Sequence, residues 1–272
     1  MLKRMLTILV AVPVIFLCTY FGGIPFFILV TALAIVSLNE FYNLLKSKGL
    51  SPYYTIGNLF TLLIIILVQF TLKHPNWEPV SSALLTLAVI TNFTAAIFVR
   101  RTAMATANIA TTLLGMLYVG WLFSYLVLLR ALTPHGAYLF FLMITIWAAD
   151  TVAFLVGTKL GKRQLSPYIS PKKTVEGAVI GFIVAVIASF IFGIIKEQSL
   201  LPVNYIHYII LGAIIGIFAQ ISDLSESIIK RDAGVKDSSN LVPGHGGVLD
   251  RMDSFIFTAP VVYYYLIWFV IK

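Results

Sequence analysis

Apolar stretches long enough to cross a membrane recur along the whole length of this chain of 272 residues. A helix rises about 1.5 Å per residue, so about 20 apolar residues cover the roughly 30 Å of a bilayer's hydrocarbon. Only 11% of the residues are charged, whereas roughly 25% are charged in a typical soluble domain. The pattern predicts an all-α polytopic membrane protein with about nine transmembrane helices. The predicted spans are Met5–Tyr20, Ile24–Leu38, Tyr54–Leu72, Val80–Val99, Thr111–Leu129, Gly136–Val156, Val175–Ile195, Tyr205–Ile221 and Phe255–Ile271.

Lysine and arginine predict the orientation of these spans, because short cytoplasmic loops carry the excess of both residues. With the N-terminus inside, 15 of the 19 basic residues fall on the cytoplasmic side. The four that fall outside are Lys73, Arg130, Lys196 and Lys272. This distribution predicts an N-in, C-out, multi-pass protein of the cell (inner) membrane, with the net charge of +8 on the cytoplasmic face.

The first half of the chain, residues 1–130, consists of hydrophobic segments joined by short loops. We expect it to be a scaffold of transmembrane helices, and residues 131–272 to form a catalytic transmembrane region with cytoplasmic polar loops. The amphipathic stretch Glu40–Leu50 is predicted to lie along the membrane surface. Glu40 and Glu78 are the acidic residues of this half, and interfacial solvation is their predicted role.

A dense polar run, Asp223–Asp253, stands out in the second half, with six of the chain's eleven carboxylates and four basic residues. Ionisable residues are costly within a membrane, so such a cluster indicates a functional site. The loop Gly157–Gly177 emerges on the same side in the N-in topology, so both segments can form one site facing the cytoplasm. Asp150 lies inside the sixth span. It either faces this cavity or makes a helix-to-helix salt bridge or hydrogen bond.

The carboxylates of the polar run suggest a divalent-metal site. Asp250 and Asp253 are three residues apart at the start of the ninth span, so they project on one face of its first turn. Asp223 lies at the cytoplasmic end of the eighth span. Oxygen ligands without thiolates or paired histidines suit Mg²⁺ and not zinc. The alternative is that Asp250 and Asp253 are helix-capping carboxylates paired with Arg251 and Lys230.

A glycine-rich turn, Pro243–Gly247, precedes the ninth span and can bring backbone amides close to an anion. Together with Lys230, Arg231 and Lys236 it is similar to a polyphosphate cradle, in which cations neutralise phosphate oxygens and glycines admit the backbone. Two roles stay open for His245, which either binds phosphate or donates a proton, or is a structural hydrogen-bonding residue.

The segment Ser170–Thr174 is predicted to open the seventh span, with Pro171 at the helix start and two lysines facing the headgroup region. A lysine pair beside a membrane usually anchors a helix on anionic lipid. The neighbouring Ser170, Thr174 and Glu176 favour a specific contact to a phosphate or a headgroup.

The signatures of familiar soluble enzymes do not occur in this sequence, which has no Walker loop, zinc spacing, nucleophile elbow or dinucleotide-binding fingerprint. Metal, cations and a membrane-level cavity favour phosphoryl or nucleotidyl transfer between a soluble nucleotide and a lipid. Nucleic acid is not expected as a partner. Three other classes of membrane protein are alternatives: an alcohol phosphotransferase or prenyltransferase, a secondary transporter coupled through Asp150, and a membrane scaffold. The first two usually show repeated motifs or related halves, which this chain lacks.

Three polar motifs resemble those of one known family. Ser227-Ile-Ile-Lys230-Arg231, Lys236-Asp237 and Pro243-Gly-His245-Gly-Gly-Val-Leu-Asp250-Arg251-Met-Asp253 are together similar to the signature of the phosphatidate cytidylyltransferase (CDP-diacylglycerol synthase) family. Ser170-Pro-Lys-Lys-Thr-Val-Glu176-Gly177 and Ala149-Asp150-Thr151 resemble further elements of the same family. The sequence departs from the family pattern at Val242, Lys172 and Val175, which affects details of the headgroup contacts.

The resemblance implies that CTP and phosphatidic acid react to CDP-diacylglycerol and pyrophosphate, with Mg²⁺ required and the lipid bilayer as partner. It implies metal ligation by Asp223, Asp250 and Asp253. A second cation such as K⁺ and a homodimer through the N-terminal helices are left open. The implied substrate contacts are Lys172 and Lys173 to the phosphatidate phosphate; Lys230, Arg231, Lys236 and Arg251 to the triphosphate; Ser170, Thr174 and Ser227 to substrate; and His245, Gly246 and Gly247 around the leaving pyrophosphate.

Overall fold

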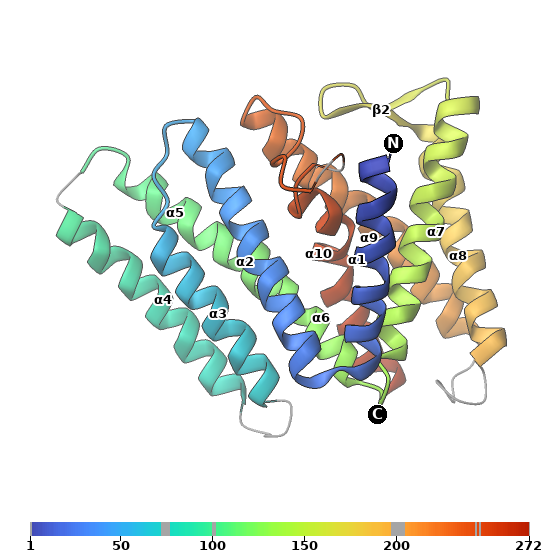
Figure 1. Ribbon diagram of the computed structural model, residues 1–272, viewed down its shortest axis with the longest axis horizontal. Helices are drawn as coiled ribbons and strands as arrows, with labels where there is room; N and C mark the ends of the chain where they lie inside the picture. Colours follow the sequence, from blue (N-terminus) through green and yellow to red (C-terminus); the bar gives the residue numbers. More distant parts are fainter. Residues whose placement is uncertain are drawn as a thin grey trace.

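The computed structural model describes residues 2–71, 77–99, 102–196, 205–242, 244 and 246–271, and helices dominate it (Figure 1). The helices are α1 (Leu2–Phe21), α2 (Gly23–Ser47), α3 (Tyr54–Thr71), α4 (Trp77–Val99), α5 (Ala105–Gly115), α6 (Leu122–Ala131), α7 (Ala137–Leu160), α8 (Val175–Lys196), α9 (Tyr205–Asp232) and α10 (Leu249–Tyr265). Two π-helical segments, η1 (Met116–Trp121) and η2 (Leu266–Val270), join α5 to α6 and extend α10. The short strands β1 (Gln164–Ser166) and β2 (Ser170–Thr174) form a hairpin.

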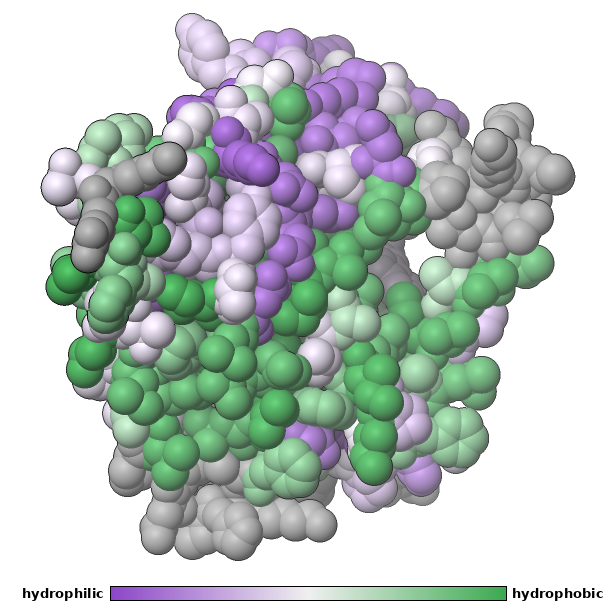
Figure 2. Space-filling model, turned by 60° about the vertical axis from the view of Figure 1, so that its left-hand side comes forward, coloured by the Kyte–Doolittle hydropathy of each residue, from purple (hydrophilic) through white to green (hydrophobic). Residues whose placement is uncertain are grey.

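The predicted class, an all-α polytopic membrane protein, is confirmed. Each of the nine predicted spans falls on helical structure, apart from single residues at some ends and Leu72, which lies outside the described residues. In the described chain, seven helical spans are long and apolar enough to cross a membrane. The remaining two apolar segments, Leu9–Phe21 and Tyr54–Phe70, are shorter. Figure 2 shows hydrophilic residues gathered mainly at the upper end of the molecule, above a broad hydrophobic surface. That surface is what a lipid-facing belt requires.

The bundle places the functional helices side by side. α7 packs on α8, α8 on α9 and α9 on α10, while α2 and α3 pack with η1 at the other side of the bundle. A continuous apolar core joins the two sides and includes the fully buried Phe41, Phe123 and Leu142. α1 begins at the end of the bundle that carries the hairpin and the α9–α10 loop, and α10 runs to the opposite end (Figure 1).

The prediction that Glu40–Leu50 lies along the membrane surface is wrong. α2 continues without a break to Ser47, so the stretch extends the second helix instead of turning away from it. Phe41 and Tyr42 are fully buried against the rest of the protein. The amphipathic pattern arises because one face of this last part of α2 meets protein and the other meets solvent.

The seventh span begins at Val175 as predicted, but the prediction that Pro171 starts the helix is wrong. Residues Ser170–Thr174 form β2, which pairs antiparallel with β1, and α8 begins at Val175. The hydroxyl of Thr174 accepts a hydrogen bond of 3.1 Å from the backbone N–H of Gly177. Thr174 thus serves as the N-terminal cap of α8. Proline is compatible with a first helical turn, but it is equally compatible with an edge strand.

Arg130 ties two backbone segments together at the end of the bundle away from the hairpin. It is 8% exposed, and its guanidinium group donates hydrogen bonds to four carbonyl oxygens. The acceptors are Thr19, Tyr20 at 2.9 Å, Pro134 at 3.0 Å and Thr133 at 3.2 Å. These bonds join the end of α1 to the α6–α7 turn.

Replacing Arg130 by leucine is expected to lower the free energy of unfolding by about 3 kcal/mol, because hydrogen bonds from a charged donor are lost and buried carbonyls are left without partners. Thermal unfolding of the detergent-purified protein measures the effect. Arg163→Leu removes an arginine whose side chain is 83% exposed and should change the midpoint little. Equal midpoints for the two variants would contradict this role for Arg130.

Candidate active site

The polar ends of α9 and α10 meet in a buried group of three charges. Lys230 is 7% exposed, and its Nζ lies 2.6 Å from Oδ1 of Asp250. The same ammonium group forms an ion pair with Glu226, one turn earlier on α9, whose side chain is completely buried. Buried charges are tolerated only when they are paired, so Lys230 holds both carboxylates in place. Of the alternatives drawn from the sequence, this geometry favours the ion pair between Asp250 and Lys230.

Asp250 is also held by the loop between the two helices. Its Oδ2 accepts hydrogen bonds from the backbone N–H of Gly247 at 2.7 Å and from the backbone N–H and the hydroxyl of Ser238, both at 2.9 Å. With Lys230 on Oδ1, both oxygens are engaged by protein donors. Asp250 therefore fixes the α9–α10 loop to the start of α10.

Asp253 lies in a separate group of carboxylates, one turn further along α10. It interacts electrostatically with Asp223 and Asp150. Its Oδ1 accepts the backbone N–H of Ser254 at 2.7 Å and the Ser254 hydroxyl at 3.4 Å, and the same hydroxyl lies 3.4 Å from Oδ2 of Asp150. Among the described residues, no lysine or arginine forms an ion pair with Asp253. Asp253 is therefore held without an ion-pair partner in the described part of the chain.

Lys173 brings one cation to the acidic group from the β-hairpin. Its Nζ lies 2.5 Å from Oδ2 of Asp223, and both side chains are about one-third exposed. Arg231 anchors the hairpin from α9, because its Nε donates to the carbonyl oxygen of Ile169, between the two strands, at 3.0 Å. Its Nη1 donates to the carbonyl oxygen of Val235, in the α9–α10 loop, at 2.6 Å. The hairpin is thus held against the ends of α7 and α8.

The carboxylates of this site can be compared with the predicted Mg²⁺ ligands. Within the described part of the chain, no three carboxylate, histidine or cysteine side chains lie close enough to enclose a metal ion. Asp223, Asp253 and Asp150 nevertheless interact with one another electrostatically, three carboxylates beside the single ion-paired Lys173 among the described residues, and all their donor atoms are oxygens. That chemistry fits Mg²⁺, which binds through one or two carboxylates and completes its shell with substrate oxygens and water. Asp250, the third predicted ligand, faces Lys230 and the loop.

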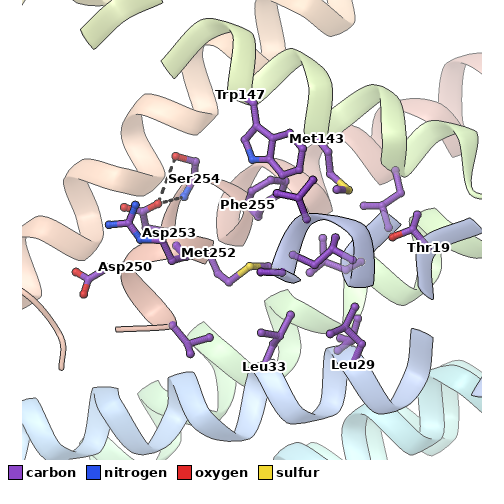
Figure 3. A pocket seen from close by; sticks show the side chains of 18 of the residues that line it. Thr19, Leu29, Leu33, Met143, Trp147, Asp250, Met252, Asp253, Ser254 and Phe255 are labelled. Carbon is purple, nitrogen blue, oxygen red and sulfur yellow. Dashed lines mark hydrogen bonds between the residues drawn. The ribbon is translucent and has the colours of Figure 1, made fainter. Parts of the chain in front are cut away.

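A cavity of about 620 Å³ opens beside these carboxylates (Figure 3). Asp250 and Asp253 lie at one end of it and Thr19 at the other. Between them the wall is apolar, and α1, α2, α7 and α10 all contribute to it. The cavity thus connects an anionic polar end with a hydrophobic interior. The residues that line its apolar part include Leu29, Leu33, Met143, Trp147, Met252 and Phe255.

Comparisons with known proteins cover almost the entire chain. The sequence model of the cytidylyltransferase family matches residues 2–269. The chain belongs to the cytidylyltransferase family. It is 35% identical to the phosphatidate cytidylyltransferase of Bacillus subtilis, across 99% of this chain and 98% of that protein. It is also 35% identical to the phosphatidate cytidylyltransferase of a Synechocystis species, across 97% of this chain and 96% of that protein. The protein of the same name from Staphylococcus haemolyticus is 31% identical, with 95% and 96% covered.

The other predicted site residues of this cytidylyltransferase surround the two charged groups to different extents. Ser227 is buried beside Asp223, with 3.4 Å between its hydroxyl and Oδ1 of that aspartate. Ser170 is half-buried in β2. The predicted cations Lys172, Lys236 and Arg251 are exposed at the polar end. His245 lies outside the described residues.

Gly246 and Gly247 have no room for side chains. Gly246 has a φ of 83°, and a Cβ there would lie 2.8 Å from Oδ2 of Asp250. A Cβ on Gly247 would collide with the side chains of Ser238 and Glu40. Gly246 and Gly247 were predicted to leave room for a phosphate. In the structure, their missing side chains leave room for the carboxylates of Asp250 and Glu40, which hold the loop.

Gly246→Ala is expected to lower the free energy of unfolding by about 1–3 kcal/mol more than Gly234→Ala, because it adds a steric clash to the same backbone strain. Gly234 is a matched control: it also has a positive φ, 73°, but a Cβ at this position would meet no other atom within 4 Å. Thermal unfolding of the two variants gives the difference. Equal losses would mean that the contact between Gly246 and Asp250 is loose.

Sequence reasoning missed Glu40. Its predicted role in interfacial solvation is wrong, because the residue is 4% exposed and its carboxylate lies against the α9–α10 loop. Glu40 and Ser238, which belongs to that loop, are 198 residues apart in the sequence. The local sequence around Glu40 carries no sign of so distant a contact. Only its position on an otherwise apolar helix could have marked it as a buried carboxylate.

Proposed function

We propose that this chain is a phosphatidate cytidylyltransferase, which transfers CMP from CTP to phosphatidic acid and yields CDP-diacylglycerol and pyrophosphate. Three full-length relatives of that name support the assignment. The structural observation that carries it is the cavity, whose anionic end meets an apolar interior at the polar end of the helix bundle. A reaction between a soluble nucleotide and a membrane lipid needs both environments in one site.

The chemistry joins a phosphatidate oxygen to the α-phosphorus of CTP. That oxygen attacks, the bond from the α-phosphorus to the bridging oxygen of the β-phosphate breaks, and pyrophosphate leaves with the bonding electrons. A phosphate monoester is already anionic near neutral pH, so no strong general base is needed. Catalysis then consists of positioning two anions and neutralising their charge.

The carboxylates Asp223 and Asp253 are suited to hold Mg²⁺, with Asp150 nearby. Bound there, Mg²⁺ would supply charge neutralisation for the triphosphate. Asp250 supports this site from the next turn of α10 by fixing Lys230 and the loop. Of the three predicted ligands, Asp223 and Asp253 thus belong to the acidic group, whereas Asp250 positions the start of α10.

The basic residues surround the acidic group on its cytoplasmic side. Lys173 reaches Asp223 from the hairpin and is placed to meet the phosphatidate phosphate. The exposed Lys172, Lys236 and Arg251 are free to contact the triphosphate or the lipid headgroup from solvent. Arg231 contributes mainly by joining the hairpin to the α9–α10 loop, through the backbone carbonyls of Ile169 and Val235. The acyl chains of phosphatidate would occupy the apolar part of the cavity.

The distribution of lysine and arginine supports the orientation. In an N-in, C-out protein with nine crossings, the end of the bundle that carries the hairpin, the α9–α10 loop and the polar surface in Figure 2 would face the cytoplasm, where CTP is made available. The bacterial relatives fit an inner-membrane location. A homodimer through the N-terminal helices stays a prediction.

The test is pyrophosphate release by the detergent-purified protein given CTP, phosphatidic acid and Mg²⁺. Diacylglycerol, which lacks the attacking phosphate, and ATP are the matched substrate controls. We expect release that requires phosphatidic acid, CTP and the metal together, with CDP-diacylglycerol as the lipid product. Folded protein that releases no pyrophosphate, or releases it equally with diacylglycerol, would overturn the assignment.

A further inference from the structure

The carboxylate of Glu40 lies within hydrogen-bonding distance of four donors in a part of the chain that is remote in sequence. Its Oε1 accepts the hydroxyl of Ser239 at 2.6 Å and the backbone N–H of Val248 at 3.0 Å. Its Oε2 accepts the hydroxyl of Ser238 at 3.0 Å and the backbone N–H of Leu249 at 2.8 Å. All four donors belong to the α9–α10 loop or to the start of α10.

These bonds replace a missing local cap. The first backbone N–H groups of a helix have no acceptor within the helix, and a Ser, Thr, Asp or Asn at the N-cap usually supplies one. The N-cap of α10 is Val248, whose side chain has no acceptor and makes no capping bond. Glu40 therefore caps α10 from α2, and its negative charge also suits the positive end of the helix dipole.

The cap adjoins the reacting end of α10. Asp250 is the second residue of that helix, and its Oδ2 shares the hydroxyl of Ser238 with Oε2 of Glu40. A hydroxyl carries one proton, so Ser238 serves one carboxylate at a time and keeps the two oxygens close. Asp253 follows one turn later on the same helix. A shift at Glu40 is thus passed on to both aspartates through a rigid first turn.

We infer that Glu40 is a positioning residue of the transfer reaction: from α2 it fixes the N-terminus of α10, and with it the placement of Asp250 and Asp253. The inference rests on the proposed function. It also gives the N-terminal half of the chain a direct part in the site, in addition to its role as a scaffold. Glu40 does not line the cavity, so it acts through the helix and not by touching substrate.

The test compares Glu40→Gln, Glu40→Asp and the control Asp232→Asn. Gln keeps the size of the side chain but turns an amide N–H₂ toward two of the four donors. Asp keeps both acceptor oxygens on a shorter stem. Asp232 is 57% exposed and pairs with Lys48 of the α2–α3 connection at 2.5 Å, so its replacement removes one negative charge at the same end of the protein without touching α10.

Two measurements decide the matter. Hydrogen–deuterium exchange should show the amides of Val248 and Leu249 exchanging at least about tenfold faster in Glu40→Gln, with the Ser222–Arg231 segment unchanged. The value of kcat should fall about 100-fold, with KM for CTP and for phosphatidic acid within about threefold of the original. Glu40→Asp should recover part of the rate, and Asp232→Asn should match the original protein in both measurements.

The outcomes separate this inference from the proposed function. If Glu40→Gln exchanges and turns over like the original protein, Glu40 does not position α10. If kcat per total protein falls only as far as the measured fraction of folded protein falls, the folded variant is fully active. The role of Glu40 is then only structural, and the inference is overturned. If Glu40→Gln does not fold, Glu40→Asp decides by the same two criteria. If the original protein shows no transfer, the proposed function fails, while amide exchange still reports whether Glu40 holds the helix.

Discussion

Asp253→Asn is expected to lower kcat by about 10³-fold while the protein stays folded. Asp253 faces Asp223 and Asp150, and no lysine or arginine pairs with it in the described part of the chain. Its charge is therefore available to a cation that carries the triphosphate, and such preorganised charge contributes a large part of catalysis in sites of this kind. Asparagine keeps the shape and can still accept the backbone N–H of Ser254.

The direction in which Asp253→Asn changes the unfolding midpoint distinguishes a role in cation binding from a structural role. Removing one of several mutually repelling carboxylates should leave the unfolding midpoint unchanged or raise it, since no ion pair is lost. Pyrophosphate release and thermal unfolding of the same preparations test both statements, with Asp232→Asn as the exposed-carboxylate control. Activity within tenfold of the original protein would exclude Asp253 from the metal and triphosphate site, and a lower midpoint would indicate a structural role.

Lys230→Met is expected to have the largest effect on stability, a loss of about 3–5 kcal/mol. Methionine has a similar length, but it leaves the buried carboxylates of Glu226 and Asp250 without their shared cation. Asp250 would retain its bonds from Ser238 and Gly247, whereas Glu226 would lose the partner that holds its charge. Unfolding in detergent at fixed pH measures the loss.

A double-mutant cycle supplies the control for this prediction. Glu226→Gln removes one of the two carboxylates, so in the Lys230→Met background it should restore part of the stability that the single substitution removes. The coupling between the two positions should be about 1–3 kcal/mol. Strictly additive losses would show that Lys230 and Glu226 do not depend on one another, and that the ion pair contributes nothing to the fold.

Much of the fold follows from local sequence. Apolar stretches of membrane-spanning length predict helices because an isolated backbone in hydrocarbon must satisfy its own hydrogen bonds, and each predicted span does lie on a helix. The sequence also predicted in outline that the charged residues cluster at one end of the bundle. This cluster contains Asp150, Asp223, Asp253 and Lys173. Charged groups on otherwise apolar helices are excluded from lipid, so they face one another at the polar end of the bundle.

Which partner each of these charged residues contacts was not predictable. Asp250 and Asp253 were expected on one face of α10 and in one metal set, yet Asp250 binds Lys230 and Ser238 while Asp253 faces Asp223. A spacing of three residues leaves a rotation between side chains that is large enough to reach different neighbours. Which neighbour each one meets depends on how α9 and α10 pack, and helix spacing alone does not contain that information.

The sequence by itself determined the class of the protein, the position of its helices and the family to which its polar motifs point, because hydrophobic length and motif spacing are local properties. Only the tertiary structure decided that Ser170–Thr174 is a strand, that Lys230 is a buried counter-ion, and that Glu40 caps a helix more than 200 residues away. Each of these depends on a charge or a backbone group meeting its partner across the bundle, and in a low-dielectric interior such partners are set by packing and not by neighbours in the chain.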